Sequence, residues 1–174
     1  MSDIDNLDRE IIAILQKDGR IPYLEIARQL GTPESTVRRR AERLVKEGVI
    51  RIAAVANPFK VGLPIVVLIG VDVELQSLKE VADHLAAIPE VRYVGYSTGA
   101  HDLIIEALFP SNETLYLFLT EKLAQVKGIH KTETSIQLHI AKRSYEWPLP
   151  SHEQLPEPEA ISDPNNATAT EIEH

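Results

Sequence analysis

The sequence predicts an α+β fold made of a small helical domain, a linker, a βαββαβ domain and an acidic tail. Within the first 50 residues, apolar side chains recur at helical spacing in three short segments. After residue 64, strand patterns alternate with helix patterns, and the final segment holds 5 of the 11 prolines without any Lys or Arg. We therefore divide the chain into four consecutive parts: residues 1–50, 51–63, 64–147 and 148–174.

The first predicted helix begins at Asp5, whose carboxylate can cap it together with Asp8 three residues later. The segment Asp18-Gly19-Arg20 ends this helix. Its inward face is formed by apolar residues at helical spacing: Leu7, Ile11, Ile14 and Leu15.

The second and third predicted helices are separated by about three residues around Gly31, which suits the left-handed position after a helix. Pro22 opens the second helix, and Thr32 is expected to cap the third, residues 33–47. The expected inward residues are Leu24, Ala27 and Leu30 in the second helix, and Val37, Ala41, Leu44 and Val45 in the third. This close spacing is typical of a helix-turn-helix, although a generic three-helix core would share it.

The outer side of the third helix favours contact with DNA. Residues 32–46 hold five basic and two acidic residues, and short hydroxyl side chains stand at the helix start. A recognition helix presents this end to the major groove, where hydroxyls and arginines bond phosphates or base edges. The predicted DNA contacts are Ser35, Thr36, Arg38, Arg39, Arg40 and Arg43. A solvated basic face is the alternative, and Arg40 can instead reach phosphate or pack at the helix flank.

The linker carries a strand pattern, because Ile50, Ile52 and Ala54 alternate with the residues between them. An extended strand at this place gives the helix-turn-helix domain its wing. Asn57-Pro58 and the pair Gly62 and Pro64 mark turns before the second domain.

The second domain shows the order βαββαβ, which is the ferredoxin-like arrangement. Its four strands are expected at Ile65–Val73, Val91–Thr98, Leu103–Phe109 and Ile129–Ala141. Ser77 and Ser111 are expected to cap the two helices, which Pro89 and Gly128 follow. Gly99-Ala100-His101 forms a tight turn between the second and third strands.

Both faces of this predicted sheet are apolar, although two helices can cover only one of them. Val66 and Leu68 in the first strand, and Ile104 and Leu108 in the third, point away from the helix-covered face. A homodimer formed through the bare face would bury them. A helix-turn-helix that binds duplex DNA commonly needs two copies related by symmetry as well.

The net charge of −8 is unevenly distributed along the chain. Residues 1–52 carry 10 basic and 9 acidic residues, whereas residues 148–174 carry six acidic residues and no basic one. A segment so poor in apolar residues cannot offset the entropy of ordering, so we expect a disordered acidic tail. An interaction tail is the alternative.

Composition excludes several functional classes. The chain contains no cysteine, which excludes disulfides, thiolate metal sites and cysteine nucleophiles. Its longest apolar run, Ile65 to Gly70, is far shorter than the roughly 18 residues of a membrane span. The acidic N-terminus lacks the features of a signal peptide, so a cytoplasmic protein is expected. The six histidines show no metal-ligand pair, and we identify no catalytic residue, metal site or cofactor.

The order of parts and several motifs resemble the Lrp/AsnC family of leucine-responsive (feast/famine) regulators over about residues 3–143. The motifs that carry the resemblance are Leu7-Asp8-Arg9-Glu10-Ile11-Ile12, Leu15-Gln16-Lys17-Asp18-Gly19-Arg20, Ser35-Thr36-Val37-Arg38-Arg39-Arg40, Gly48-Val49-Ile50, Thr98-Gly99 with Asp102-Leu103, and Thr132-Glu133-Thr134-Ser135.

The resemblance implies a transcriptional regulator that binds double-stranded DNA as a homodimer, a tetramer or an octamer. It also implies an amino acid or similar small effector, bound by the C-terminal domain near a Gly-x-x-Asp turn. In this chain the implied effector residues are Gly99, His101, Asp102, Thr132 and Thr134.

Two alternatives belong to other functional classes. Haem-pathway decarboxylases of the sirohaem type share this two-domain plan, but Tyr93-Val94-Gly95 and His101-Asp102-Leu103-Ile104-Ile105 depart from their motifs. A stand-alone amino-acid sensor would not need the intact run Arg38-Arg39-Arg40. We therefore expect that the protein is not an enzyme.

Overall fold

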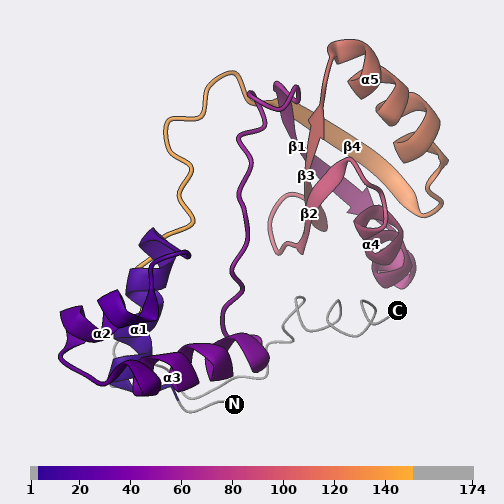
Figure 1. The fold of residues 1–174 in the computed structure, drawn as a ribbon. Coiled ribbons are helices and arrows are strands. Elements are labelled where there is room, and N and C mark those ends of the chain that lie inside the picture. Colours follow the sequence, from indigo (N-terminus) through magenta and orange to yellow (C-terminus); the bar gives the residue numbers. More distant parts are fainter. Residues whose placement is uncertain (1–3, 151–174) are drawn as a thin grey trace, which may run out of the picture. The chain divides into compact units, whose positions relative to one another are not determined.

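The computed structural model describes residues 4–150, which form two compact units (Figure 1). The N-terminal unit comprises the chain up to Ala54 together with the segment that starts at Arg143, and the C-terminal unit is Val55–Lys142. The predicted acidic tail lies outside the described residues, except for residues 148–150.

Three helices form the N-terminal unit, as the sequence predicts: α1 (Asn6–Lys17), α2 (Tyr23–Leu30) and α3 (Glu34–Lys46). Two residues expected in the core are substantially exposed, since Leu24 is 47% and Val45 is 44% exposed. Ile26 is fully buried in place of Leu24, because α2 is rotated so that Ile26 and Ala27 face the other helices. The core consists of Ile11, Ile12, Leu15, Ile26, Ala27, Val37, Ala41 and Leu44.

The sequence predicts capping residues at the start of α1, the end of α2 and the start of α3, and the first two predictions are confirmed. Asp5 and Asp8 form the predicted capping box of α1, and Gly31 adopts the left-handed conformation after α2, with φ of 61°. The expected cap by Thr32 is wrong. Pro33 occupies the N-cap position of α3, and no side chain bonds to the helix end there.

The linker forms no strand, which differs from the alternation of residues 50–54. A β-strand needs hydrogen-bonded neighbours, and within the described chain only β1 to β4 pair with one another. Ile52 and Val55 are consequently exposed. The turn predicted at Asn57-Pro58 is present, with the N–H groups of Lys60 and Val61 donating to the Asn57 carbonyl.

The C-terminal unit contains the predicted four-stranded antiparallel sheet in the order β2-β3-β1-β4. The strands are β1 (Ile65–Val73), β2 (Val91–Tyr96), β3 (Leu103–Phe109) and β4 (Ile129–Ile136). The second strand ends two residues before the expected Thr98, and the last strand ends at Ile136, inside the expected range 129–141. Val66, Leu68 and Ile104 all lie on the face that lacks helices. Val66 is nevertheless fully buried, whereas Leu68 and Ile104 remain partly exposed.

Helices α4 (Leu78–Ala86) and α5 (Asn112–Leu117) lie on one side of this sheet (Figure 1). Ser111 caps α5 as predicted, whereas Ser77 stands at the N-cap of α4 without a side-chain bond. After α5 the chain continues as a π-helical turn, Phe118–Lys122, and a 3-10 turn, Leu123–Gln125. Odd-numbered residues of β1 and β3 pack against these helices: Val67, Ile69, Val71, Val73, Leu103, Ile105, Ala107 and Phe109.

The chain after β4 returns to the N-terminal unit. Leu149 packs against the helical core, the Trp147 N–H donates to Gln16 Oε1 (3.3 Å), and Arg9 Nη1 donates to the Pro150 carbonyl (2.5 Å). Residues 147–150 are therefore held against α1, because both Arg9 and Gln16 belong to that helix.

Candidate functional site

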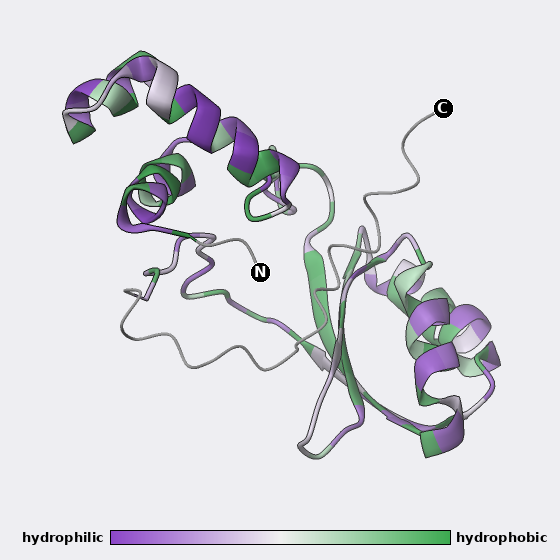
Figure 2. Ribbon diagram, turned by 90° about the horizontal axis from the view of Figure 1, so that it is seen from below, coloured by the Kyte–Doolittle hydropathy of each residue, from purple (hydrophilic) through white to green (hydrophobic). Residues whose placement is uncertain are grey.

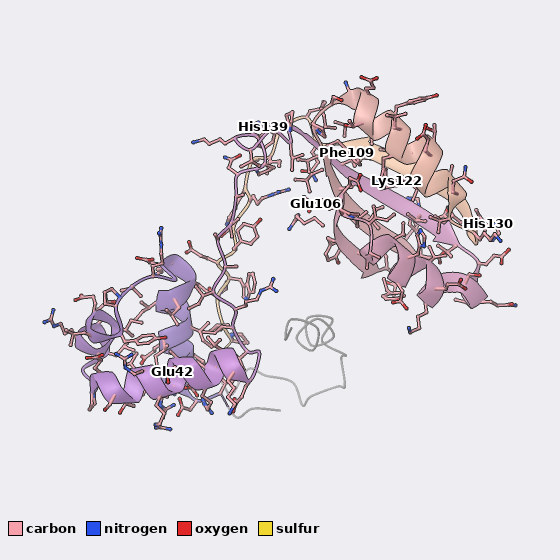
Figure 3. The ribbon with its side chains drawn as sticks, turned by 45° about the vertical axis from the view of Figure 1, so that its right-hand side comes forward. Glu42, Glu106, Phe109, Lys122, His130 and His139 are labelled. Atoms are coloured by element: carbon pink, nitrogen blue, oxygen red, sulfur yellow. The ribbon has the colours of Figure 1, made fainter. Side chains whose placement is uncertain are left out.

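The outward side of α3 begins with small and basic side chains. Figure 2 shows α3 mainly in the hydrophilic colour, and Figure 3 marks Glu42 on this helix. Ser35, Arg38 and Arg39 are exposed, and Thr36 is half-buried. Pro33 sets the start of the helix with its φ of −62°, so these residues fall within the first two turns. This end carries unpaired N–H groups and the positive end of the helix dipole, which favour an anion.

Arg38 is oriented by two neighbours. Its Nη2 atom lies 2.7 Å from Glu34 Oε1, one helical turn earlier, and its guanidinium lies 5.3 Å from the centroid of the Tyr23 ring. The Glu34 carboxylate raises the pKa of Arg38 above its ordinary value, so this side chain stays charged. Arg39 has no partner among the described residues, and it points to solvent.

Arg40 and Arg43 are arranged differently, because both reach back to α1. Arg40 Nη1 lies 2.6 Å from Asp5 Oδ2 and 3.0 Å from Asp8 Oδ1. Arg43 Nη2 bonds the other oxygen of Asp8, which is only 1% exposed. The hydrogen bond from Arg40 is the largest influence that lowers the pKa of Asp5 below its ordinary value. The structure thus does not bring these two arginines together with Arg38 and Arg39.

Sequence reasoning identified Asp8 only as a capping residue and missed its buried pairing. The signal that could have found it is the spacing of Asp8. It stands three and four residues before Ile11 and Ile12, and therefore on the apolar face of α1. A charged residue at such a position is almost never buried unless it is paired, and the run of arginines in α3 supplies the partners.

The Gly-x-x-Asp turn, residues 97–102, is closed by its own backbone and by Asp102. The Ser97 N–H donates to the Asp102 carbonyl (2.9 Å), and the Gly99 N–H donates to Ser97 Oγ (3.2 Å). The Asp102 carboxylate accepts a hydrogen bond from the Val73 N–H at the end of β1 (2.8 Å). Asp102 therefore ties the turn to the sheet with one of its oxygens.

His101 folds onto the face of the sheet that lacks helices. Its Nδ1 atom lies 2.7 Å from Asp72 Oδ1, and its Nε2 atom lies 3.8 Å from Glu133 Oε2. The ring occupies the space above Gly70, where an added Cβ would lie 2.1 Å from His101 Cδ2. Gly70 is thus the residue that lets His101 pack flat against β1, and sequence reasoning did not identify it.

Thr132 and Thr134 lie on the opposite face of the sheet from His101. In the register of β1 with β4, Thr132 pairs with Val71 and Thr134 with Ile69, whose side chains belong to the helix-covered core. Glu133 pairs with Gly70 and therefore shares the bare face with His101. Thr132 instead lines a cavity of about 200 Å³, together with Leu119, Leu123 and His130.

Two further features of the described residues bear on function. No group of three or more His, Asp or Glu side chains in residues 4–150 is arranged to hold a metal ion. None of the helices in the same range is long and apolar enough to cross a membrane.

Comparisons with known families match both units. Residues 4–45 match the AsnC-type helix-turn-helix domain, and residues 66–147 match the Lrp/AsnC ligand binding domain. An uncharacterized HTH-type transcriptional regulator of Pyrococcus horikoshii is 48% identical over 144 residues, which cover 82% of this chain and 91% of that protein. The HTH-type transcriptional regulator FL11 of Pyrococcus furiosus is 36% identical over 147 residues, covering 84% and 97%.

Solved structures show the same fold. AsnC of E. coli superposes with a TM-score of 0.76 at 28% identity, covering 82% of this chain and 97% of that one. A transcriptional regulator from Neisseria meningitidis in complex with L-Met gives a TM-score of 0.79 at 24% identity, covering 88% and 100%.

Proposed function

The chain belongs to the Lrp/AsnC family of transcriptional regulators, and from this premise we propose that α3 contacts the major groove of double-stranded DNA through Ser35, Thr36, Arg38 and Arg39. The observation that carries the proposal is the exposed start of α3. There Arg38 is held in place by Glu34 and Tyr23, and Arg39 points to solvent. An oriented guanidinium can bond a guanine edge, and a solvated one can bond phosphate.

We further propose that the protein acts as a homodimer, with higher assemblies built from it. Support comes from the bare face of the sheet, where Leu68 and Tyr93 are partly exposed on either side of Glu106 in the strand register, and Ile104 is partly exposed two residues along β3. Two copies related by a two-fold axis would present two recognition helices to successive major grooves.

Salt-dependent DNA binding tests the proposal. The full-length protein is titrated with a 30-bp duplex enriched from a random pool, at ionic strengths from about 50 to 200 mM. The logarithm of the affinity is expected to fall linearly with the logarithm of salt concentration, by about 0.9 for each phosphate neutralised. Absence of binding to any duplex in the pool at the lowest salt would contradict the proposal.

For the ligand-binding domain, we propose an amino acid or similar small effector beside the 97–102 turn. The carboxylates of Asp72 and Glu133 around His101 favour an ammonium group, and an effector carboxylate would take the Gly99 N–H from its present acceptor, Ser97 Oγ. The candidates in this turn are Gly99, His101 and Asp102. Thr132 and Thr134 lie across the sheet, so they cannot contact the same small molecule from within one chain. A thermal-shift screen over the twenty amino acids identifies the effector by the largest rise in melting temperature.

Gly70→Ala is expected to destabilise the C-terminal unit by about 1–3 kcal/mol, because the added methyl overlaps the His101 ring and overpacking costs this much. In a His101→Ala background the same change should cost little, since the ring is gone. Chemical denaturation of the four proteins measures the coupling between the two positions. Equal costs of Gly70→Ala in both backgrounds would show that His101 does not pack on Gly70.

A further inference from the structure

We propose that Asp8 is a positioning residue for DNA recognition, which anchors α3 through Arg40 and Arg43 and keeps both charges away from the DNA. The inference deepens the proposed function and rests on DNA contact by α3. It divides the basic residues of one helix into two groups: Arg38 and Arg39 face outward, whereas Arg40 and Arg43 connect α3 to α1.

The geometry at Asp8 uses both of its carboxylate oxygens. Oδ1 accepts from Arg40 Nη1 at 3.0 Å, and Oδ2 accepts from Arg43 Nη2 and from the Asp5 N–H. The two arginines are three residues apart on α3, so their guanidinium groups converge on one carboxylate. Asp5 adds a second acceptor for Arg40 Nη1 at 2.6 Å.

Burial makes this arrangement costly to break. Asp8 is 1% exposed, and an ionised carboxylate in such a place requires charged or hydrogen-bonding partners. Arg40 and Arg43 are themselves 21% and 33% exposed at their side chains, compared with 54% for Arg38. Arg40 Nε is buried without a hydrogen bond among the described residues, so its terminal nitrogens carry the attachment to α1.

The consequence concerns the charge that DNA meets. With Arg40 and Arg43 bonded to Asp5 and Asp8, the described cations on the exposed side of α3 are Arg38, Arg39 and Lys46. Asp8 therefore does two things at once. It sets the orientation of α3 on α1, and it prevents two flexible cations from binding phosphates at any sequence.

A matched pair of variants in the full-length protein tests the division. Arg39→Gln and Arg43→Gln remove the same charge from the same helix, four residues apart. For the enriched duplex, we measure the slope of the logarithm of affinity against the logarithm of salt concentration. This slope is expected to become shallower by about 0.9 in Arg39→Gln and to stay unchanged in Arg43→Gln. An equal loss of slope in the two variants would overturn the inference. Circular dichroism confirms that each variant is folded.

Asp8→Asn tests the second role, since it keeps the shape of the side chain, releases Arg43 and leaves Arg40 with Asp5 as its remaining acceptor. Affinity for a 30-bp duplex of unrelated sequence is expected to rise. The slope of the logarithm of affinity against the logarithm of salt concentration is expected to steepen by about 0.9 for the released Arg43, so discrimination in favour of the enriched duplex falls. Asp18→Asn is the control, because it makes the same charge change at an exposed position at the end of α1.

Asp8→Asn and Asp18→Asn distinguish a failure of this inference from a failure of the proposed function. Identical binding of both to unrelated DNA, or a loss of slope in Asp8→Asn, would overturn the role of Asp8 while leaving DNA binding by α3 intact. Failure of the proposed function looks different, because the unmodified protein would then show no salt-dependent binding to any duplex.

Discussion

Replacing Leu44 with Ala is expected to destabilise the N-terminal unit by about 2–5 kcal/mol and to abolish DNA binding. Leu44 is fully buried in α3 and packs in the small core formed with α1 and α2. Truncation of a buried leucine leaves a cavity and loses the transfer free energy of the removed atoms. A small helical unit buries little apolar surface, so its free energy of unfolding is too small to absorb a loss of this size.

The only tryptophan of the chain makes this measurement direct. Trp147 lies on the N-terminal unit, where its main-chain N–H donates to Gln16 Oε1 in α1. Its fluorescence during urea unfolding therefore reports on that unit. Leu24→Ala is the matched control, because it makes the same substitution at a position in α2 that is 47% exposed. Normal DNA binding and stability in Leu44→Ala would contradict the assignment of the core.

Replacing Phe109 with Ala is expected to cost the C-terminal unit about 3–5 kcal/mol. Phe109 ends β3 with its ring buried, and Figure 3 labels it in this unit. Its ring centroid lies 5.0 Å from that of Phe118, with the ring planes tilted by 53°. The substitution therefore removes a large apolar surface and an aromatic pair that joins the sheet to the π-helical turn.

Hydrogen exchange resolves this effect within the C-terminal unit. The amides of Leu103 and Ile105 in β3 are expected to lose protection in Phe109→Ala, because global opening then requires less free energy. Tyr116→Ala, at an exposed aromatic position on α5, serves as the control and should keep protection close to that of the unmodified protein. If the two variants exchange alike, Phe109 does not hold the sheet to its helices.

Local signals predicted much of the fold because they depend on neighbours in sequence. The capping boxes at Asp5 and Ser111 satisfy helix N–H groups within three residues. Gly31 adopts the left-handed backbone conformation that ends α2, which glycine reaches without steric cost. The strands Ile65–Val73 and Leu103–Phe109 have the predicted limits. Their alternation reflects a core on one face, and this periodicity is visible in the residues alone.

Local signals failed where partners came from elsewhere in the chain. Leu24 and Ile26 are equally apolar, and only packing against α1 and α3 places Ile26 inside. The linker alternates like a strand but finds no pairing neighbour among the described residues. In the ligand-binding domain, the family motif grouped Thr132 with His101, whereas the register of β4 separates them by the thickness of the sheet.

The residue pattern alone determined the family, the order of helices and strands, and the basic character of α3, because periodicity, caps and motifs are properties of adjacent residues. Tertiary structure decided what each charge does. Arg38, Arg39, Arg40 and Arg43 look equivalent on a helix taken by itself. The buried carboxylate of Asp8, brought across from α1, binds two of them and leaves the outward pair to solvent, since a carboxylate removed from water must find its counter-charges nearby.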